Sequence, residues 1–476
     1  MAVLDRVNRT TAEPKRSEPF KRKVGPLYPT VSDGETRQRL TRAAICISYI
    51  NGKASICGVY ALRCIKTAPK MKGEDSTMLR SVEHILTTHA GSLPRPDALL
   101  KAWSKAATTA QEERALESLL RNAVATVVTD QVKAGIDIPN DGEFGKPMRA
   151  ASDLAAWGTY IFGRLAGFGQ TPPGAAAPAR AAAGQPMRIV GERWEQRDFG
   201  EFYDASGLVP SVASRPCCVA PLSYSGRDAA KRDVANLKRA VEAAKLEEAF
   251  VTSIAVGSLE MFCRGQDAYY KKPEAFLDAI AKAMSVEYRT IVDAGFVLQI
   301  DDPGLPDTWD MLDPHPTLNE YKHYATLRVE ALNQALTGIP EDRVRYHICW
   351  GSWHGPHTTD LPLRDIVEVM LKVKAQAYSV EAGNVRHEHE YKVWQDVKLP
   401  DGKILIPGVV SHATNVVEHP ELVADRLVAY AGAVGRENVI AGTDCGLGGR
   451  VHPQIARAKL NVLAEGARLA TARLWR

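Results

Sequence analysis

The sequence has no run of eighteen or more apolar residues, the length that a membrane-spanning helix requires. Its start, MAVLDRVNRT, also lacks the apolar stretch and small-residue cleavage site of a secretory signal. Eight cysteines in 476 residues do not make a disulfide framework. We therefore expect a cytoplasmic protein that binds no membrane, whose cysteines are reduced thiols or metal ligands.

The net charge of +4 hides an uneven distribution. Residues 1–77 carry 15 Lys and Arg against 7 Asp and Glu, a net of +8, so the remainder has a net of −4. A basic segment could bind nucleic acid. However, this one mixes KRSEPFKRK with AICISYINGKASICGVYALRC and shows neither a helical nor a strand period. We expect residues 1–77 to be a disordered N-terminal extension with no nucleic-acid partner, and residues 78–476 to be the folded domain.

From residue 78 onward, short apolar runs alternate with amphipathic stretches such as 227–249 and 272–295. The runs predict eight strands, near 85–89, 135–140, 250–256, 296–301, 344–349, 375–381, 404–410 and 438–443. Repeated strand–helix units with buried strands indicate an α/β fold, and eight of them indicate a (β/α)₈ TIM barrel. The Ala/Pro/Gly-rich stretch TPPGAAAPARAAAGQP (171–186) predicts a flexible loop in a long insertion after the second strand.

Polar groups follow nearly every predicted strand. These strand ends read THAGS, NDGE, QIDDP, HIC, SVE, SHATN and TDCG in chain order. In a barrel of this type, catalytic groups lie at the carboxyl ends of the strands. The pattern therefore favours an enzyme with one central site.

The stretch YHICWGSWHGPH (346–357) raises the question of a metal site. His347 and Cys349 share one face of the fifth strand because side chains alternate with period two. Glu381 ends the sixth strand and Cys445 follows the eighth, so all four can converge. Thiolate, imidazole and carboxylate together suit Zn²⁺. Either cysteine alone reads more simply as a small buried hydrophobe, but four soft ligands on three strand ends favour the metal.

These motifs point to a known family. Region 84–476 resembles the catalytic C-terminal barrel of cobalamin-independent methionine synthase. The matches, in family order, are HILTTHAGSLPRP, IPNDGEFGKPM, LQIDDPGLP, HIC, YSVEAGN, IPGVVSHATNVVE and GTDCGLGGR. The resemblance implies a (β/α)₈ barrel in which zinc binds the thiol of homocysteine, and the thiolate attacks a methyl group on the N5 nitrogen of a folate.

The resemblance also implies the role of each matched residue. Four match the zinc ligands: His347, Cys349, Glu381 and Cys445. Glu143 and Asp301 match the carboxylates that hold the amino group of the acceptor, and Ser92 matches a residue near the acceptor carboxylate. His412 matches a histidine that helps to protonate the leaving nitrogen. A hydrogen-bonded loop histidine is an equally simple reading of His412.

The chain departs from the family in three places. It lacks the second, N-terminal barrel of full-length methionine synthases, WGSWHGPHTTD (350–360) is altered, and residues 155–215 match nothing in the folate site. Single-barrel relatives include short methionine synthases that use other methyl donors. They also include epoxyalkane:coenzyme M transferases, in which a zinc-bound thiolate opens an epoxide.

The two acceptors differ in charge, because coenzyme M ends in a sulfonate and has no amine. The presence of Glu143 and Asp301 favours an amino-acid thiol as the acceptor. Arg95 and Lys146, however, could bind an anionic end, so both acceptors remain open. A metal-free decarboxylase barrel or a non-catalytic binding barrel would not need HxC and DCG. We expect a zinc-dependent S-methyltransferase whose partners are a small-molecule thiol and a methyl or alkyl donor.

Overall fold

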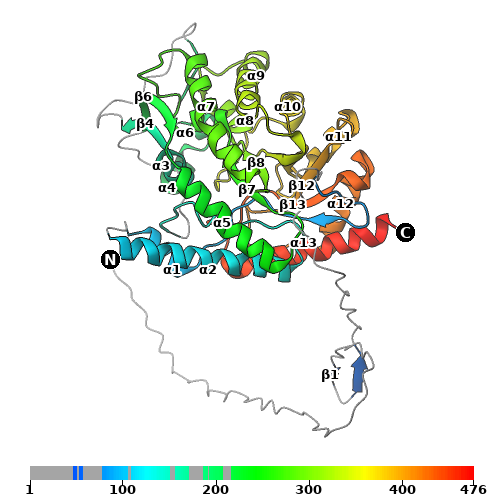
Figure 1. Ribbon diagram of the computed structural model, residues 1–476. Coiled ribbons are helices and arrows are strands. Elements are labelled where there is room, and N and C mark those ends of the chain that lie inside the picture. Colours follow the sequence, from blue (N-terminus) through cyan, green and yellow to red (C-terminus); the bar gives the residue numbers. More distant parts are fainter. Residues whose placement is uncertain are drawn as a thin grey trace, which may run out of the picture. The chain divides into compact units, whose positions relative to one another are not determined.

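The computed structural model describes residues 47–50, 53–56, 78–105, 109–150, 156–170, 186–190, 192–206 and 216–476 (Figure 1). The chain divides into two compact units, Met1–Thr67 and Ala68–Arg476. The described part of the first is an antiparallel pair, β1 (Ile47–Ile50) and β2 (Lys53–Ile56). The rest of the predicted extension 1–77, and all but the last residue of the predicted loop 171–186, lie outside the described residues.

A seven-stranded parallel sheet forms the centre of the second unit, in the order β3-β13-β12-β11-β10-β8-β7. In chain order its strands are β3 (Leu86–Thr87), β7 (Phe250–Ile254), β8 (Val297–Asp301), β10 (Val344–His347), β11 (Ala377–Glu381), β12 (Ile404–Val410) and β13 (Ile440–Thr443). Every residue of these strands is buried. This is the burial expected of parallel strands whose two faces are covered.

Residues 135–140 do not form a strand, so the prediction of a strand there is wrong. Pro139 has no backbone N–H to contribute to a ladder. The backbone of Asn140 is held instead by a side chain, because its N–H donates to Gln131 Oε1 at 3.0 Å and its carbonyl accepts from Gln131 Nε2 at 2.8 Å. These bonds replace the strand ladder that the apolar pattern predicted.

The same segment still bridges the two edges of the sheet. The Ile138 N–H donates to the Thr87 carbonyl of β3 at 3.0 Å, and the Phe250 N–H of β7 donates to the Pro139 carbonyl at 3.1 Å. The sheet is therefore curled, as in TIM-like α/β folds, with seven regular strands rather than eight.

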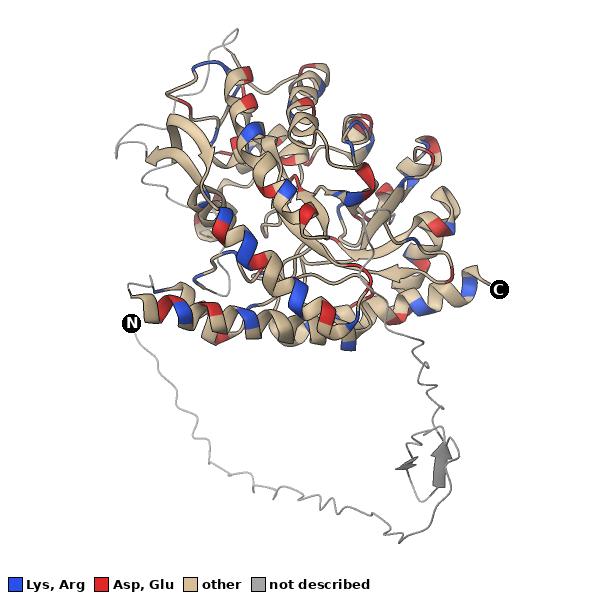
Figure 2. Ribbon diagram, viewed as in Figure 1, with Lys and Arg blue, Asp and Glu red and all other residues tan. Residues whose placement is uncertain are grey.

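Helices cover the outside of the sheet. The longer ones are α1 (Asp97–Trp103), α2 (Ala110–Ala134), α5 (Arg227–Ala244), α6 (Val256–Phe262), α7 (Pro273–Asp293), α9 (Leu318–Ala335), α10 (Leu363–Met370), α12 (Pro420–Val434) and α13 (Pro453–Leu474). Helices α5 and α7 confirm the two predicted amphipathic stretches. Charges of both signs are spread over the outer helices, whereas the sheet is largely uncharged (Figure 2). Among the described helices, none is both long and apolar enough to cross a membrane.

The described residues between 156 and 224 form further helices and strands that the hydrophobic periodicity of the sequence did not predict. They are α3 (Ala156–Gly163), β4 (Leu165–Gln170), β5 (Arg188–Ile189), the 3₁₀ turn η1 (Trp194–Arg197), α4 (Gly200–Ser206) and β6 (Pro216–Tyr224). Strand β4 pairs with β6, and β5 pairs with β9 (Leu312–Asp313), both antiparallel. We call the described residues 156–170, 186–190 and 192–206 the arm.

Short elements complete the fold after β8. They are α8 (Gly304–Asp307), η2 (Thr308–Met311), η3 (Glu341–Arg343), η4 (Glu388–Lys392), α11 (Val393–Asp396) and η5 (Arg436–Asn438). The antiparallel pairing of β5 with β9 ties the arm to the segment that follows β8. This segment begins at the carboxyl end of the sheet, where the candidate site lies.

Candidate functional site

A cavity of about 300 Å³ lies at the carboxyl ends of the parallel strands. Six of the eight residues predicted for the site line it: Ser92, Glu143, Asp301, His347, Cys349 and Cys445. The other two, Glu381 and His412, belong to an adjoining group with Asp444. The strand ends thus bring the predicted residues together as two neighbouring sets.

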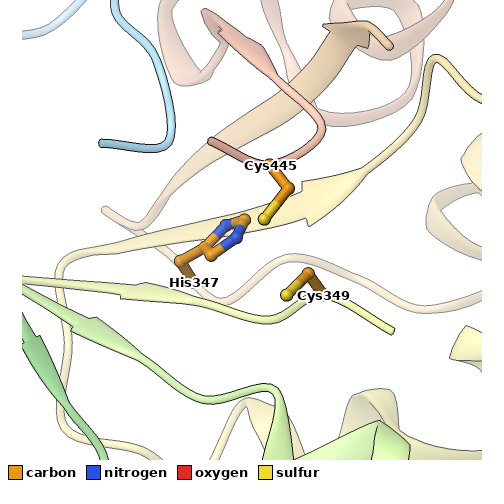
Figure 3. Close-up of side chains that lie close together, drawn as sticks. All are labelled: His347, Cys349 and Cys445. Atoms are coloured by element: carbon orange, nitrogen blue, oxygen red, sulfur yellow. The ribbon is translucent and has the colours of Figure 1, made fainter. Parts of the chain in front are cut away.

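The first set consists of His347, Cys349 and Cys445, whose ligand atoms all lie within 4.8 Å of one another. Figure 3 shows the two sulfur atoms and the imidazole turned toward one another. His347 Nδ1 is 3.0 Å from the Ser379 hydroxyl of β11, while its Nε2 is buried and makes no hydrogen bond within the described residues. An imidazole held at one nitrogen with the other left open is the usual arrangement of a metal ligand.

The two thiols differ in acidity. A hydrogen bond from the Cys349 thiol, together with nearby His347 and His412, lowers the pKa of Cys445 well below its usual value. The same bond, followed by burial, raises the pKa of Cys349. Cys445 therefore gives up its proton first, and a cation entering the group would meet a thiolate there.

Glu381 lies in the second set, with His412 and Asp444, where the ligand atoms are again within 4.8 Å of one another. Its carboxylate accepts hydrogen bonds from the Trp350 N–H at 3.0 Å and from Asn384 Nδ2 at 2.5 Å. Burial raises the pKa of Glu381, and the neighbouring Cys445 adds to that rise. The predicted fourth ligand is therefore next to Cys445 but already hydrogen-bonded to the Trp350 backbone and the Asn384 side chain.

Asp444 joins the ends of two strands. Its Oδ1 accepts from the Ala382 and Gly383 N–H groups, both at 2.7 Å, and its Oδ2 accepts from Asn384 Nδ2 at 3.1 Å. A Cβ atom at position 383 would lie only 2.8 Å from the Gly408 carbonyl oxygen of β12. The two backbone segments can therefore approach each other this closely only because residue 383 is glycine. The position of Cys445 is thereby tied to that of Glu381.

His412 follows β12 and is buried. Burial lowers the pKa of His412 to about 4, so its imidazole is neutral at pH 7. Its Nδ1 makes no hydrogen bond within the described residues. This nitrogen is therefore open to a ligand or a proton.

Glu143 lies at the other end of the cavity in a strained backbone conformation, with a φ of 62°. Its Oε1 accepts from the Thr252 hydroxyl at 2.7 Å and lies 3.2 Å from Lys146 Nζ. Lys146 Nζ in turn sits 3.8 Å from the centre of the Trp157 ring. A buried cation therefore already faces this carboxylate.

Asp301 is the second carboxylate of this end. Burial raises the pKa of Asp301 to about 7, with Glu143 adding to the rise and His347 opposing it. Gln299 Nε2 donates to its Oδ1 at 2.6 Å. Ser92 anchors the loop after Cys445, because its carbonyl accepts from the Leu447 N–H at 2.8 Å.

The arm contributes cavity residues that the sequence did not predict. Trp157 and Arg193 both line the cavity. Arg193 Nη2 donates to Asp307 Oδ2 at 2.8 Å, and its guanidinium lies 3.4 Å from the centre of the Trp353 ring. No local signal marks Arg193, because its partner Asp307 is 114 positions away in the sequence. Arg450 also lines the cavity, and the LGGR sequence just after Cys445 was the available clue.

The altered loop 350–360 forms a hydrogen-bonded network outside the metal group. Asp360 bridges His357 Nδ1 at 3.0 Å and His387 Nε2 at 3.1 Å, and His387 Nδ1 reaches Glu390 at 2.9 Å. The His387 ring stacks on the buried Trp350 at 3.9 Å. This places His357 in the support of the loop rather than in the first set.

With this geometry in hand, the chain can be compared with known proteins. Residues 192–468 match the family model described as "Cobalamin-independent synthase, Catalytic domain". The chain belongs to this family. The resemblance that the motifs carried is therefore confirmed.

Relatives in the cobalamin-independent synthase family carry two names. The 2-hydroxypropyl-CoM lyase of Xanthobacter autotrophicus is 23% identical over 434 residues, covering 85% of this chain and 98% of the relative. The methionine synthase of Sulfurisphaera tokodaii is 25% identical over 391 residues, covering 80% and 91%. A B12-independent methionine synthase structure from Shewanella sp. W3-18-1 in complex with selenomethionine has a TM-score of 0.57 at 22% identity, covering 82% of this chain and 99% of that one. This last likeness supports the shared fold.

The His387 network predicts pH-dependent stability. Burial alone would lower the pKa of His387, but its hydrogen bonds to Asp360 and Glu390 raise it to about 10. The folded-state pKa thus exceeds the usual 6.5, so the stabilisation is complete below pH 6.5 and is lost as pH rises through about 10.

We expect His387→Gln to lower the free energy of unfolding by about 1–3 kcal/mol at neutral pH. The exposed His389, on the same 3₁₀ turn, gives the control His389→Gln. Urea unfolding from pH 6 upward measures both, and a His387→Gln penalty that stays constant past pH 10 would contradict the network.

Proposed function

We propose that this protein transfers a methyl group to a thiol in a zinc-dependent reaction, with homocysteine as the acceptor and a methyl-folate or a related compound as the donor. The observation that carries the proposal is the grouping of His347, Cys349 and Cys445 within 4.8 Å, with a buried His347 Nε2 that makes no hydrogen bond within the described residues. Family membership and the methionine synthase relatives support the same class of reaction.

The residues of the first set fit a zinc ion. Two sulfurs and one imidazole nitrogen would hold it, with Glu381 next to Cys445 as the candidate fourth ligand. When bound, zinc lowers the pKa of a coordinated thiol, which near neutral pH is otherwise mostly protonated at a pKa of ~8.5. Three protein ligands would leave a position for the acceptor sulfur if Glu381 keeps its bonds to Trp350 and Asn384.

Glu143 and Asp301 would orient the acceptor. Both carboxylates line the cavity that also contains His347, so an ammonium group between them would place the acceptor sulfur near the metal group. Ser92 lies on the same wall, where its hydroxyl can donate to the carboxylate of an amino acid.

His412 would assist the leaving group. Its neutral state at pH 7 means that it must first be protonated, and a thiolate at Cys445 favours the imidazolium. As the sulfur–carbon bond forms and the carbon–nitrogen bond of the donor breaks, the nitrogen keeps the electron pair and takes a proton from His412. General acid catalysis of this kind contributes on the order of 10²–10⁴ in rate.

A second candidate function is the opening of an epoxide by the thiolate of coenzyme M. The observation that favours it is Lys146, whose ammonium lies 3.2 Å from Glu143 and compensates the charge that would attract an amine. A sulfonate would instead be attracted to Lys146. The relative named 2-hydroxypropyl-CoM lyase supports this alternative.

Metal content tests the site. We expect the purified chain to bind about one equivalent of zinc. Cys445→Ser should lose most of it, because the more acidic thiol is removed from the three-residue group. Cys217→Ser is the control, since Cys217 is also a free thiol but belongs to no group of metal-ligand residues in the described chain. Equal zinc content in the two variants, measured by mass spectrometry, would rule out this metal site.

The product distinguishes the two candidate functions. The zinc-loaded protein is incubated with homocysteine or coenzyme M, each with methyl-folate, methylcobalamin or a small epoxide, and thioethers are identified by mass. We expect methionine. A hydroxyalkyl thioether of coenzyme M would move the assignment to epoxide opening, and the absence of any thioether would refute both.

The role of His412 is tested by changing how good the leaving group is. With methyl-folate, His412→Asn should lower kcat by about 10²–10⁴ at unchanged KM, because the amine needs a proton to leave. With a methylsulfonium donor, whose neutral thioether leaves without one, the loss should nearly vanish. His419→Asn, at the exposed start of α12, is the control. An equal loss with both donors would make His412 structural.

A further inference from the structure

We propose that Arg450 binds an anionic group on the alkyl donor, such as a carboxylate, sulfonate or phosphate, and so selects donors that carry one. This inference rests on the proposed thiol alkylation and assigns a residue to its second substrate. Arg450 lies in the loop between β13 and α13, five residues after Cys445. It lines the main cavity and also a second pocket of about 500 Å³ beside it.

The Arg450 guanidinium makes no hydrogen bond or ion pair with any residue in the described part of the chain. Burial lowers the pKa of Arg450, and the only groups that oppose this are the thiols of Cys445 and Cys349. A partly buried cation therefore lines the cavity, and no carboxylate among the described residues balances it. Such a group is costly unless a ligand supplies the missing charge.

Four other Lys and Arg residues line the main cavity, and each is already bonded. Arg193 pairs with Asp307, and Lys146 pairs with Glu143. Arg95 Nη2 donates to the Glu143 carbonyl, and Arg264 Nη1 donates to the Val190 carbonyl. These bonds hold the arm and the acceptor end in place. Arg450 makes no such bond within the described residues, and the loop that carries it is held by other groups, with the Leu447 and Gly448 N–H groups donating to the Ser92 carbonyl.

The second pocket is suited to an anion. Its lining contains no carboxylate, and besides Arg450 it consists of His354, Ala413, Thr414, Asn415 and Val416. Burial and the neighbouring Arg450 lower the pKa of His354, so its ring can donate a neutral hydrogen bond, as Thr414 and Asn415 can. A planar guanidinium can bind a carboxylate or phosphate with two parallel hydrogen bonds.

The position of this pocket assigns it to the donor. The loop that lines it directly follows His412, whose pKa is also affected by Arg450 and His354. Glu143 and Asp301, the acceptor residues, do not line it. A donor held at Arg450 would therefore have its leaving atom near His412 and its electrophilic carbon toward the sulfur group. The anion takes no part in bond breaking, and the new sulfur–carbon bond forms as in the proposed reaction.

Equilibrium binding tests the anion site without turnover. The full chain is titrated with glutarate, methanesulfonate and inorganic phosphate at low ionic strength, and the heat of binding is measured by calorimetry. We expect Arg450→Met to weaken binding of at least one anion about tenfold or more, and Arg450→Lys to retain most of it. Arg457→Met is the matched control, because it removes the same charge from an exposed residue of α13 that faces Asp130. Equal binding by wild type and Arg450→Met, or no binding by either, would overturn the anion site.

Kinetics then separates donor from acceptor. Arg450→Met should raise KM for an anionic donor about tenfold, leave KM for the thiol unchanged, and affect an uncharged methyl donor little. A raised KM for the thiol alone would overturn the assignment to the donor. If anions bind through Arg450 but no thioether forms with any donor, the anion site stands while the proposed thiol alkylation fails.

Discussion

The Asp444 carboxylate is the interaction on which the rest of the site depends. It accepts hydrogen bonds from two successive backbone N–H groups after β11, while it stands at the end of β13 itself. Because parallel strands place all their carboxyl ends at one edge, a single side chain can lock two of them in register. Cys445 follows one of these strand ends and Glu381 lies at the other. The hydrogen bonds of Asp444 therefore fix the distance between the first set, which contains Cys445, and the second set, which contains Glu381. Glycine at position 383 permits the close approach.

Much of the site follows from local rules. His347 and Cys349 are two residues apart at the end of a strand, so period two alone places both side chains on one face. The polar groups after each apolar run predict a single site at the carboxyl edge, and the cavity there contains six of the eight expected residues. Helices α5 and α7 also follow from apolar spacing, because their buried positions recur every three to four residues.

Other features depend on hydrogen bonds that hydrophobic spacing does not encode. Residues 135–140 have the apolar pattern of a strand, yet Gln131 takes the backbone bonds of Asn140 and Pro139 cannot donate. The Glu381 carboxylate is held by Trp350 and Asn384, which no spacing rule identifies. Arg193 is held at the cavity wall by Asp307, which is 114 positions away in the sequence. Hydrophobic period cannot predict contacts of this kind, because they are made by single polar side chains.

The attachment of the arm has a consequence for how this protein can change over time. The residues of the first set come from the strand ends at 347, 349 and 445, whereas part of the cavity wall comes from the arm, which the Arg193–Asp307 pair and the β5–β9 ladder join to the segment after β8. Mutations in the arm can therefore reshape this wall without disturbing the first set. The strand ends and this part of the cavity can thus change independently during evolution.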